Sequence, residues 1–202
     1  EPAGANCMQA SFAAGKVTTL PTVNTIADGT AVKTPGNKIF PYIQKNLDDI
    51  ITVTDDELIV SFLDMVENHK MIVENSGLLT VAALKHLNVK DKRVVSILSG
   101  GNMDVITMSS VVQQGLIFRD RIFTVSVLLP DKPGELLKVA KVIADAKGNV
   151  IKIDHNQFVS INRNAAVELG ITLEAFGMEH KEEILNAMRK AGYNPKIIQT
   201  TM

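Results

Sequence analysis

The sequence is poor in the features that many specialised binding surfaces need. It has no tryptophan and 4% aromatic residues, so platforms for stacking nucleic-acid bases or sugars are scarce. Cys7 is the only cysteine, which excludes an intrachain disulfide and a cysteine metal cluster and fits a reducing compartment. No apolar run approaches the roughly 20 residues of a membrane span. Neither charge sign dominates, with 21 Lys and Arg against 22 Asp and Glu. We therefore expect a cytoplasmic protein whose partners are neither nucleic acid nor membrane.

The sequence does contain enough apolar material for a packed core. Hydrophobic residues make up 46% of the 202 residues and charged residues 21%, which is the balance of a globular protein. The pattern of apolar residues changes near residue 119, so we treat the two parts in turn.

The first part reads as α/β. Apolar spacing and helix-end signals predict helices over residues 4–14, 39–47 and 54–69, and another from Ser76 through Leu87. Thr54 and Glu57 form a capping box at the start of the third of these helices. Short apolar runs predict strands at residues 50–53 and 93–98, the second of them covered on both faces.

The second part predicts a different arrangement. The expected order is a strand at 122–129, a helix up to Gly148, strands at 150–153 and 167–173, a helix at 181–190 and a last strand at 196–199. This order is the split βαβ arrangement of ferredoxin-like domains.

Few residues are candidates for chemistry. Ser99, Gly100, Gly101 and Asn102 follow the predicted buried strand, and Asp104 can cap a helix after them, so the glycine turn is either a ligand site or a tight structural turn. Glu74 ends an apolar stretch and is either a site residue or a helix-cap acid. The turn at residues 131–134 is either a ligand site or a plain hairpin or strand-to-helix turn. The four histidines lack metal-ligand spacing and are interpreted as structural or exposed.

Five motifs in register resemble the threonine/serine dehydratases. They are Glu1-Pro-Ala-Gly-Ala-Asn, Thr25-Ile-Ala-Asp-Gly, Leu47-Asp-Asp-Ile-Ile, Glu74-Asn-Ser-Gly and Ser99-Gly-Gly-Asn-Met-Asp. These dehydratases are pyridoxal-phosphate enzymes of the tryptophan-synthase β-like fold, also called fold type II. The remaining residues resemble a ferredoxin-like βαββαβ ACT domain. The resemblance implies that residues 1–117 are the C-terminal part of a catalytic domain and that residues 118–202 are a regulatory domain.

The resemblance also implies a function and its residues. The complete enzyme would use pyridoxal 5'-phosphate to deaminate L-threonine to 2-oxobutanoate, or L-serine to pyruvate, and would form a homodimer or homotetramer. The implied cofactor-binding residues are Ser99, Gly100, Gly101 and Glu74. The implied effector-binding residues, for an amino-acid regulator, are Asp131, Pro133, Gly134, Glu135, Leu136 and Asn149.

Two departures from the family limit what we expect of this chain. Family members hold the cofactor through a lysine in a Ser-Phe-Lys-x-Arg-Gly-like motif, which is missing here, so we assign no catalytic residue and expect the chain to be inactive and without cofactor when alone. Glu1, Ala5 and Asn37 match three cation ligands of some relatives, but Cys7 replaces the fourth, an aspartate, so we expect no metal.

The alternative hypothesis is a stand-alone amino-acid-binding regulatory module.

Overall fold

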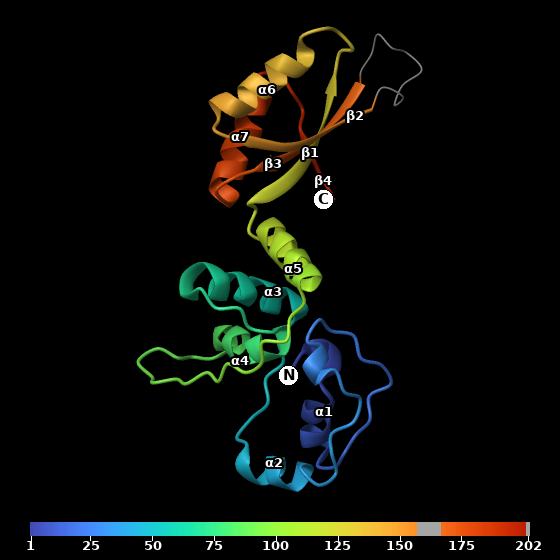
Figure 1. Cartoon of the computed structure of the whole chain (residues 1–202), viewed down its shortest axis with the longest axis vertical. Coiled ribbons are helices and arrows are strands. Elements are labelled where there is room, and N and C mark those ends of the chain that lie inside the picture. Colours follow the sequence, from blue (N-terminus) through green and yellow to red (C-terminus); the bar gives the residue numbers. More distant parts are fainter. Residues whose placement is uncertain (157–166, 201–202) are drawn as a thin grey trace. The chain divides into compact units, whose positions relative to one another are not determined.

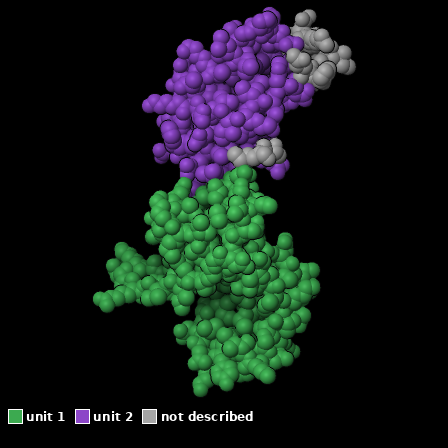
Figure 2. All heavy atoms as spheres, viewed as in Figure 1, with its two compact units in different colours: residues 1–115 green, residues 116–202 purple. Residues whose placement is uncertain are grey.

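The computed structural model describes residues 1–156 and 167–200, which form two compact units. Unit 1 comprises Glu1–Gly115 and unit 2 comprises Leu116–Met202 (Figures 1 and 2). Among the helices of the described ranges, none has the length and apolar character needed to cross a membrane.

Unit 1 is built mainly from short helices joined by loops. Its α-helices are α1 (Cys7–Ala14), α2 (Phe40–Asn46), α3 (Asp55–Asp64), α4 (Leu79–Ala82) and α5 (Val105–Phe118), the last of which runs past residue 115. Its 3-10 helices are η1 (Ala3–Ala5), η2 (Asp28–Thr30), η4 (Asn75–Leu78) and η5 (Ala83–His86), and η3 (Met65–His69) is a π-helical turn. The three helices predicted before residue 70 are confirmed, whereas the one predicted after Ser76 is divided among η4, α4 and η5.

The α3 helix begins as its sequence predicts. The Thr54 hydroxyl accepts a hydrogen bond from the Glu57 amide at 3.3 Å, and the Glu57 carboxylate accepts one from the Thr54 amide at 2.8 Å. This capping box satisfies two amides that a helix start otherwise leaves unpaired. The buried side chains of α3 then pack into the core of unit 1, which includes Leu58, Phe62 and Leu78.

The two strands predicted in unit 1 are wrong. Among the described residues, Val53 makes an isolated bridge to Pro2, and residues 93–98 pair with no strand. Instead of being covered on both faces, Val95 is 88% exposed and Ile97 is 72% exposed. The physical reason is that an apolar run becomes a buried strand only where neighbouring strands flank it, and here α4 is the neighbour that holds it, through a hydrogen bond from the Thr80 hydroxyl to the Ile97 carbonyl at 2.9 Å.

Unit 2 has the predicted order of strands and helices. The strands are β1 (Ile122–Leu129), β2 (Asn149–Asn156), β3 (Val167–Glu174) and β4 (Lys196–Ile198), and the helices are α6 (Glu135–Asp145) and α7 (Met178–Lys190). The sheet order is β2-β3-β1-β4, and the pairs β1–β3, β1–β4 and β2–β3 are all antiparallel. The ferredoxin-like arrangement expected from the sequence is therefore confirmed.

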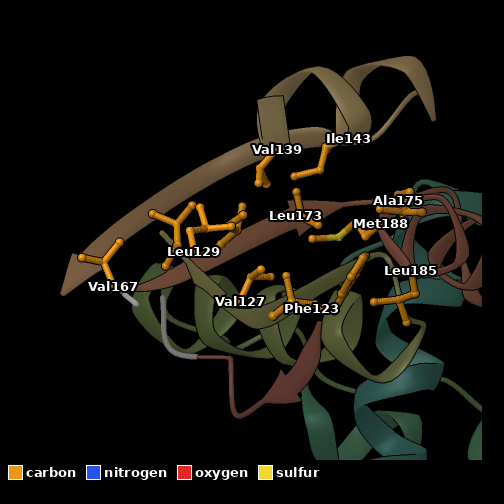
Figure 3. Packing of buried hydrophobic residues seen from close by; sticks show 14 residues of the cluster. Phe123, Val127, Leu129, Val139, Ile143, Val167, Leu173, Ala175, Leu185 and Met188 are labelled. Atoms are coloured by element: carbon orange, nitrogen blue, oxygen red, sulfur yellow. The ribbon is translucent and has the colours of Figure 1, made fainter. Parts of the chain in front are cut away.

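Alternation along the central strands builds the core of unit 2. Val125 and Val127 on β1 and Ile171 and Leu173 on β3 are at most 1% exposed, while the residues between them form the other face of the sheet. The buried side chains meet those of α6 and α7, as Figure 3 shows for Val139, Ile143 and Met188 among others. One face of the sheet thus carries both helices.

Candidate functional site

The glycine turn after residue 98 packs directly on Glu74. The Asn102 amide donates a hydrogen bond to Glu74 Oε2 at 3.1 Å, and the Glu74 amide donates one to the Gly100 carbonyl at 3.5 Å. Gly100 has φ +79°, and an added Cβ there would lie 2.1 Å from the Glu74 carboxyl carbon. The structure therefore brings Glu74 together with the predicted turn, and position 100 requires glycine both for its backbone conformation and for space.

The backbone of Ser99 packs against Gly77, a residue that was not predicted to belong to the site. A Cβ at Gly77 would lie 1.8 Å from the Ser99 carbonyl oxygen, so this glycine allows the two backbones to touch. Ser99 and Gly101 are exposed, and a Cβ at Gly101 would meet nothing within 4 Å. The sequence signal for Gly77 was its place three residues after Glu74 in the quoted motif.

A cavity of about 550 Å³ lies next to the turn in unit 1. Carboxylates and amides line it, including Asp28, Glu74, Asn75, Asn102 and Asp104, and its lining contains no Lys, Arg or His among the described residues. The Asn75 side chain donates to the Ile26 carbonyl at 3.0 Å, while its buried oxygen and the buried Ser76 hydroxyl have no hydrogen-bond partner in the described part of the chain. Ser76 is not part of the lining, and the cavity therefore combines carboxylate and amide groups with apolar side chains such as Ile26, Ile59 and Met103.

Asp104 caps α5 immediately after the turn, as predicted. Its carboxylate accepts hydrogen bonds from the Ile106 and Thr107 amides, both at 2.9 Å, and from the Thr107 hydroxyl. These bonds, led by the one from the Thr107 hydroxyl, hold the pKa of Asp104 below its usual value. The turn is thus fixed at its far end by a helix start.

The predicted effector residues of unit 2 lie at two ends of the sheet. Gly134 has φ +91° and precedes α6, and Glu135 pairs with Lys138 at 2.7 Å. Asn149 instead starts β2, where its side-chain amide donates to Glu174 at 3.1 Å.

The sheet register shows how far apart these two places are. Asn149 and Ile122 both pair with Glu174, at the start of β1, whereas the turn follows Leu129 at the end of the same strand. Within a single chain, Asn149 therefore lies at the opposite end of the sheet from Asp131, Pro133, Gly134, Glu135 and Leu136. The effector role of these residues stays a prediction.

Glu1, one of the residues that match cation ligands of relatives, makes hydrogen bonds within the chain instead. The two Glu1 carboxylate oxygens accept hydrogen bonds from the Met8 amide at 2.9 Å and the Gln9 amide at 2.7 Å, so this side chain caps α1. Cys7 is buried, and burial raises the pKa of its thiol. Over residues 1–156 and 167–200, no group of three or more His, Cys, Asp or Glu side chains could hold a metal ion.

Comparison with known proteins identifies the first half of the chain. Residues 1–100 match the family model described as pyridoxal-phosphate dependent enzyme. Over these residues the chain is similar to the pyridoxal-phosphate dependent enzymes. The fold is that of such enzymes: a structure of the processed form of threonine deaminase isoform 2 from Solanum lycopersicum has a TM-score of 0.53 and 30% identity, over 56% of this chain and 34% of that one.

The similarity to curated proteins extends over both units. L-threonine ammonia-lyase of Geobacter sulfurreducens is 36% identical over 96% of this chain, and L-threonine ammonia-lyase of Thermotoga maritima is 31% identical over 95%. The chain spans about half the length of these relatives, 48% of each.

Proposed function

We propose that this chain is part of a pyridoxal-phosphate dependent ammonia-lyase that deaminates L-threonine to 2-oxobutanoate, or L-serine to pyruvate. The observation that carries the proposal is the alignment with L-threonine ammonia-lyases over both units, at 36% identity for the Geobacter sulfurreducens protein. An alignment of this extent supports a shared reaction more strongly than a shared fold does.

The glycine turn supports a place for the cofactor. The exposed Ser99 hydroxyl, with open space beside Gly101, fits an aromatic ring whose nitrogen takes part in a hydrogen bond. Ser99 would hold the pyridine nitrogen, and the bound cofactor would supply an electron sink for elimination. A neutral hydroxyl does not protonate the ring as an aspartic acid would, which moderates that sink and favours elimination over other carbanion reactions.

Complementation tests the proposed reaction. This chain is co-expressed with the portion of the Geobacter sulfurreducens L-threonine ammonia-lyase that it does not align with, and formation of 2-oxobutanoate from threonine is measured. We expect turnover from the pair and none from the chain alone, which lacks the lysine motif. Ser99→Ala should reduce the turnover of the pair at least about tenfold. Co-purification of the two portions without turnover would contradict the proposal.

For unit 2 we propose an ACT-type regulatory domain that binds an amino acid and joins copies of the chain into a homodimer or homotetramer in the cytoplasm. The turn at Gly134 supports an effector carboxylate, because no side chain caps α6 and amides of its first turn can donate to an anion. Calorimetry with isoleucine, valine, threonine and serine measures this binding, and Asn149→Ala tests whether Asn149, which lies away from the turn within one chain, contributes to it. Unchanged affinity in that variant would remove Asn149 from the site, and sedimentation measures the assembly.

The second candidate function is a stand-alone amino-acid-binding module. Unit 2 favours it because this unit has its own core, made by β1, β3, α6 and α7. Amino-acid binding by calorimetry, together with absence of turnover in the complementation assay, would select this function over the lyase.

A further inference from the structure

The segment that contains the glycine turn is attached to one short stretch of unit 1 at regular intervals. Thr80 donates to the Ile97 carbonyl at 2.9 Å, Gly77 touches the Ser99 carbonyl, and Glu74 binds Gly100 and Asn102. The three attaching residues are spaced by three in the sequence: Glu74 directly precedes η4 in an extended conformation, Gly77 lies within η4, and Thr80 lies in α4.

Among the residues that the structure describes, Glu74 is the only one of these three whose side chain accepts a hydrogen bond from the turn. Its amide donates to the Gly100 carbonyl at 3.5 Å and its Oε2 accepts from the Asn102 amide at 3.1 Å, so backbone and side chain bracket the turn. The second of these bonds joins a carboxylate to a backbone amide and is of the stronger, charge-assisted kind.

The Glu74 carboxylate packs closely against the backbone of the turn. A Cβ at Gly100 would lie 2.1 to 2.6 Å from its three atoms, and a Cβ at Gly29 would lie 3.5 Å from Oε1. The backbone at Gly100 can therefore approach Glu74 only because it carries no side chain, whereas the Gly29 backbone lies at an ordinary contact distance.

We propose that Glu74 is a positioning residue whose carboxylate holds the Gly100–Asn102 turn and thereby fixes the Ser99 hydroxyl. This replaces the expected role of Glu74 as a direct cofactor contact. The link from Ser99 to pyridoxal phosphate rests on the proposed function, whereas the hold on the turn does not.

The first test needs neither cofactor nor substrate. Amide hydrogen exchange at Asn102 is measured by NMR in this chain and in Glu74→Ala, Glu74→Gln and Glu74→Asp, with the exposed Asp48→Ala as the matched loss of a carboxylate in the same unit. We expect exchange at Asn102 to accelerate about tenfold in Glu74→Ala, as loss of one hydrogen bond implies, and to change less than about threefold in Asp48→Ala.

The conservative variants keep the test decisive if Glu74→Ala does not fold. The carboxamide of Glu74→Gln still accepts from the Asn102 amide, whereas the shorter Glu74→Asp withdraws from it. Exchange should therefore be slower in Glu74→Gln than in Glu74→Asp. Equal rates in the two variants, or unchanged exchange in Glu74→Ala, would overturn the proposal.

A second readout separates positioning of Ser99 from a purely local role. In the complemented pair, the absorption band of bound pyridoxal phosphate reports on hydrogen bonding at its ring nitrogen. Glu74→Ala should change this band in the same direction as Ser99→Ala, and Glu74→Gln should restore it. A normal band in Glu74→Ala, with accelerated exchange at Asn102, would contradict the effect on Ser99. If the unsubstituted pair binds no cofactor, the proposed function fails while the exchange result still decides the role of Glu74.

Discussion

Two adjacent glycines in the turn have opposite surroundings. Gly100 has φ +79° and faces the Glu74 carboxylate, whereas Gly101 has open space where a side chain would stand. The sequence predicted the turn but could not rank its two glycines, because the contact that distinguishes them comes from a residue 26 positions earlier in the chain.

Alanine at each position should show which of the two glycines is required by its backbone conformation and its contact with Glu74. Gly100→Ala should lower the free energy of unfolding of unit 1 by about 1–3 kcal/mol, since alanine is strained at this φ and its Cβ meets Glu74. Gly101→Ala should change it by less than about 0.5 kcal/mol. Urea denaturation of the two variants makes the comparison, and equal losses would show that the turn does not pack on Glu74.

His180 is a second residue whose neighbours define its state. Its Nδ1 accepts from the Phe176 amide at 3.1 Å, so the ring proton lies on Nε2, which faces the Ala146 carbonyl at 2.8 Å. The ring also stacks on Phe176 with centroids 4.7 Å apart.

His180→Phe keeps an aromatic ring but removes both hydrogen bonds. We expect a loss of about 1–3 kcal/mol in the stability of unit 2, because the Phe176 amide and the Ala146 carbonyl lose their partner. The exposed His155 provides the matched control, and His155→Phe should stay within about 0.5 kcal/mol. Urea denaturation, followed with a probe in unit 2, measures the stability of both variants. Equal stability of His180→Phe and His155→Phe would contradict the role of His180.

At the scale of elements, features that depend on neighbouring residues in the sequence were predictable, whereas features that depend on distant residues were not. The start of α3 was predictable because the capping box lies within four residues, Thr54 to Glu57. The strand predicted at residues 93–98 failed because burial of an apolar run depends on what lies beside it. The effector residues show the same limit, since the register that separates Asn149 from Gly134 is a property of the assembled sheet.

The capping box should make the stability of unit 1 depend on pH. Burial alone would raise the pKa of Glu57, but hydrogen bonds from Thr54 and His86 outweigh it and lower the pKa below its ordinary value of 4.5. The unfolded chain therefore binds this proton first as the pH falls, so the stabilisation is present above pH 4.5 and is lost as the pH falls through the lower, folded value.

Thr54→Ala tests this dependence. It should cost about 1 kcal/mol at neutral pH and should flatten the fall in stability below pH 4.5. The exposed Thr34 serves as the control, and Thr34→Ala should keep the full pH dependence. Denaturation at a series of pH values measures both, and an unaltered acid slope in Thr54→Ala would refute the assignment.

At the scale of the whole molecule, the chain consists of two units with separate cores. Phe62 is fully buried among residues of unit 1 only, and Ile171 is 1% exposed among residues of unit 2 only. The change of pattern near residue 119 predicted such a division, because each part carries its own apolar periodicity.

Cavity-forming substitutions should act on one unit at a time. Phe62→Ala should destabilise unit 1 by about 3–5 kcal/mol and Ile171→Ala should destabilise unit 2 by about 2–5 kcal/mol. Native-state hydrogen exchange, read residue by residue, should place each loss in its own unit. Loss of protection in both units from either variant would show that they unfold as one.

The open segment at residues 93–98 has a consequence for handling this protein. It combines β-branched residues, a single charge at Arg93 and backbone groups without strand partners, which is the composition of segments that associate edge to edge. Concentrated solutions should therefore become turbid through this segment while both cores stay folded. Val95→Lys, at an 88% exposed position, should raise the concentration at which light scattering begins and leave the unfolding transitions unchanged.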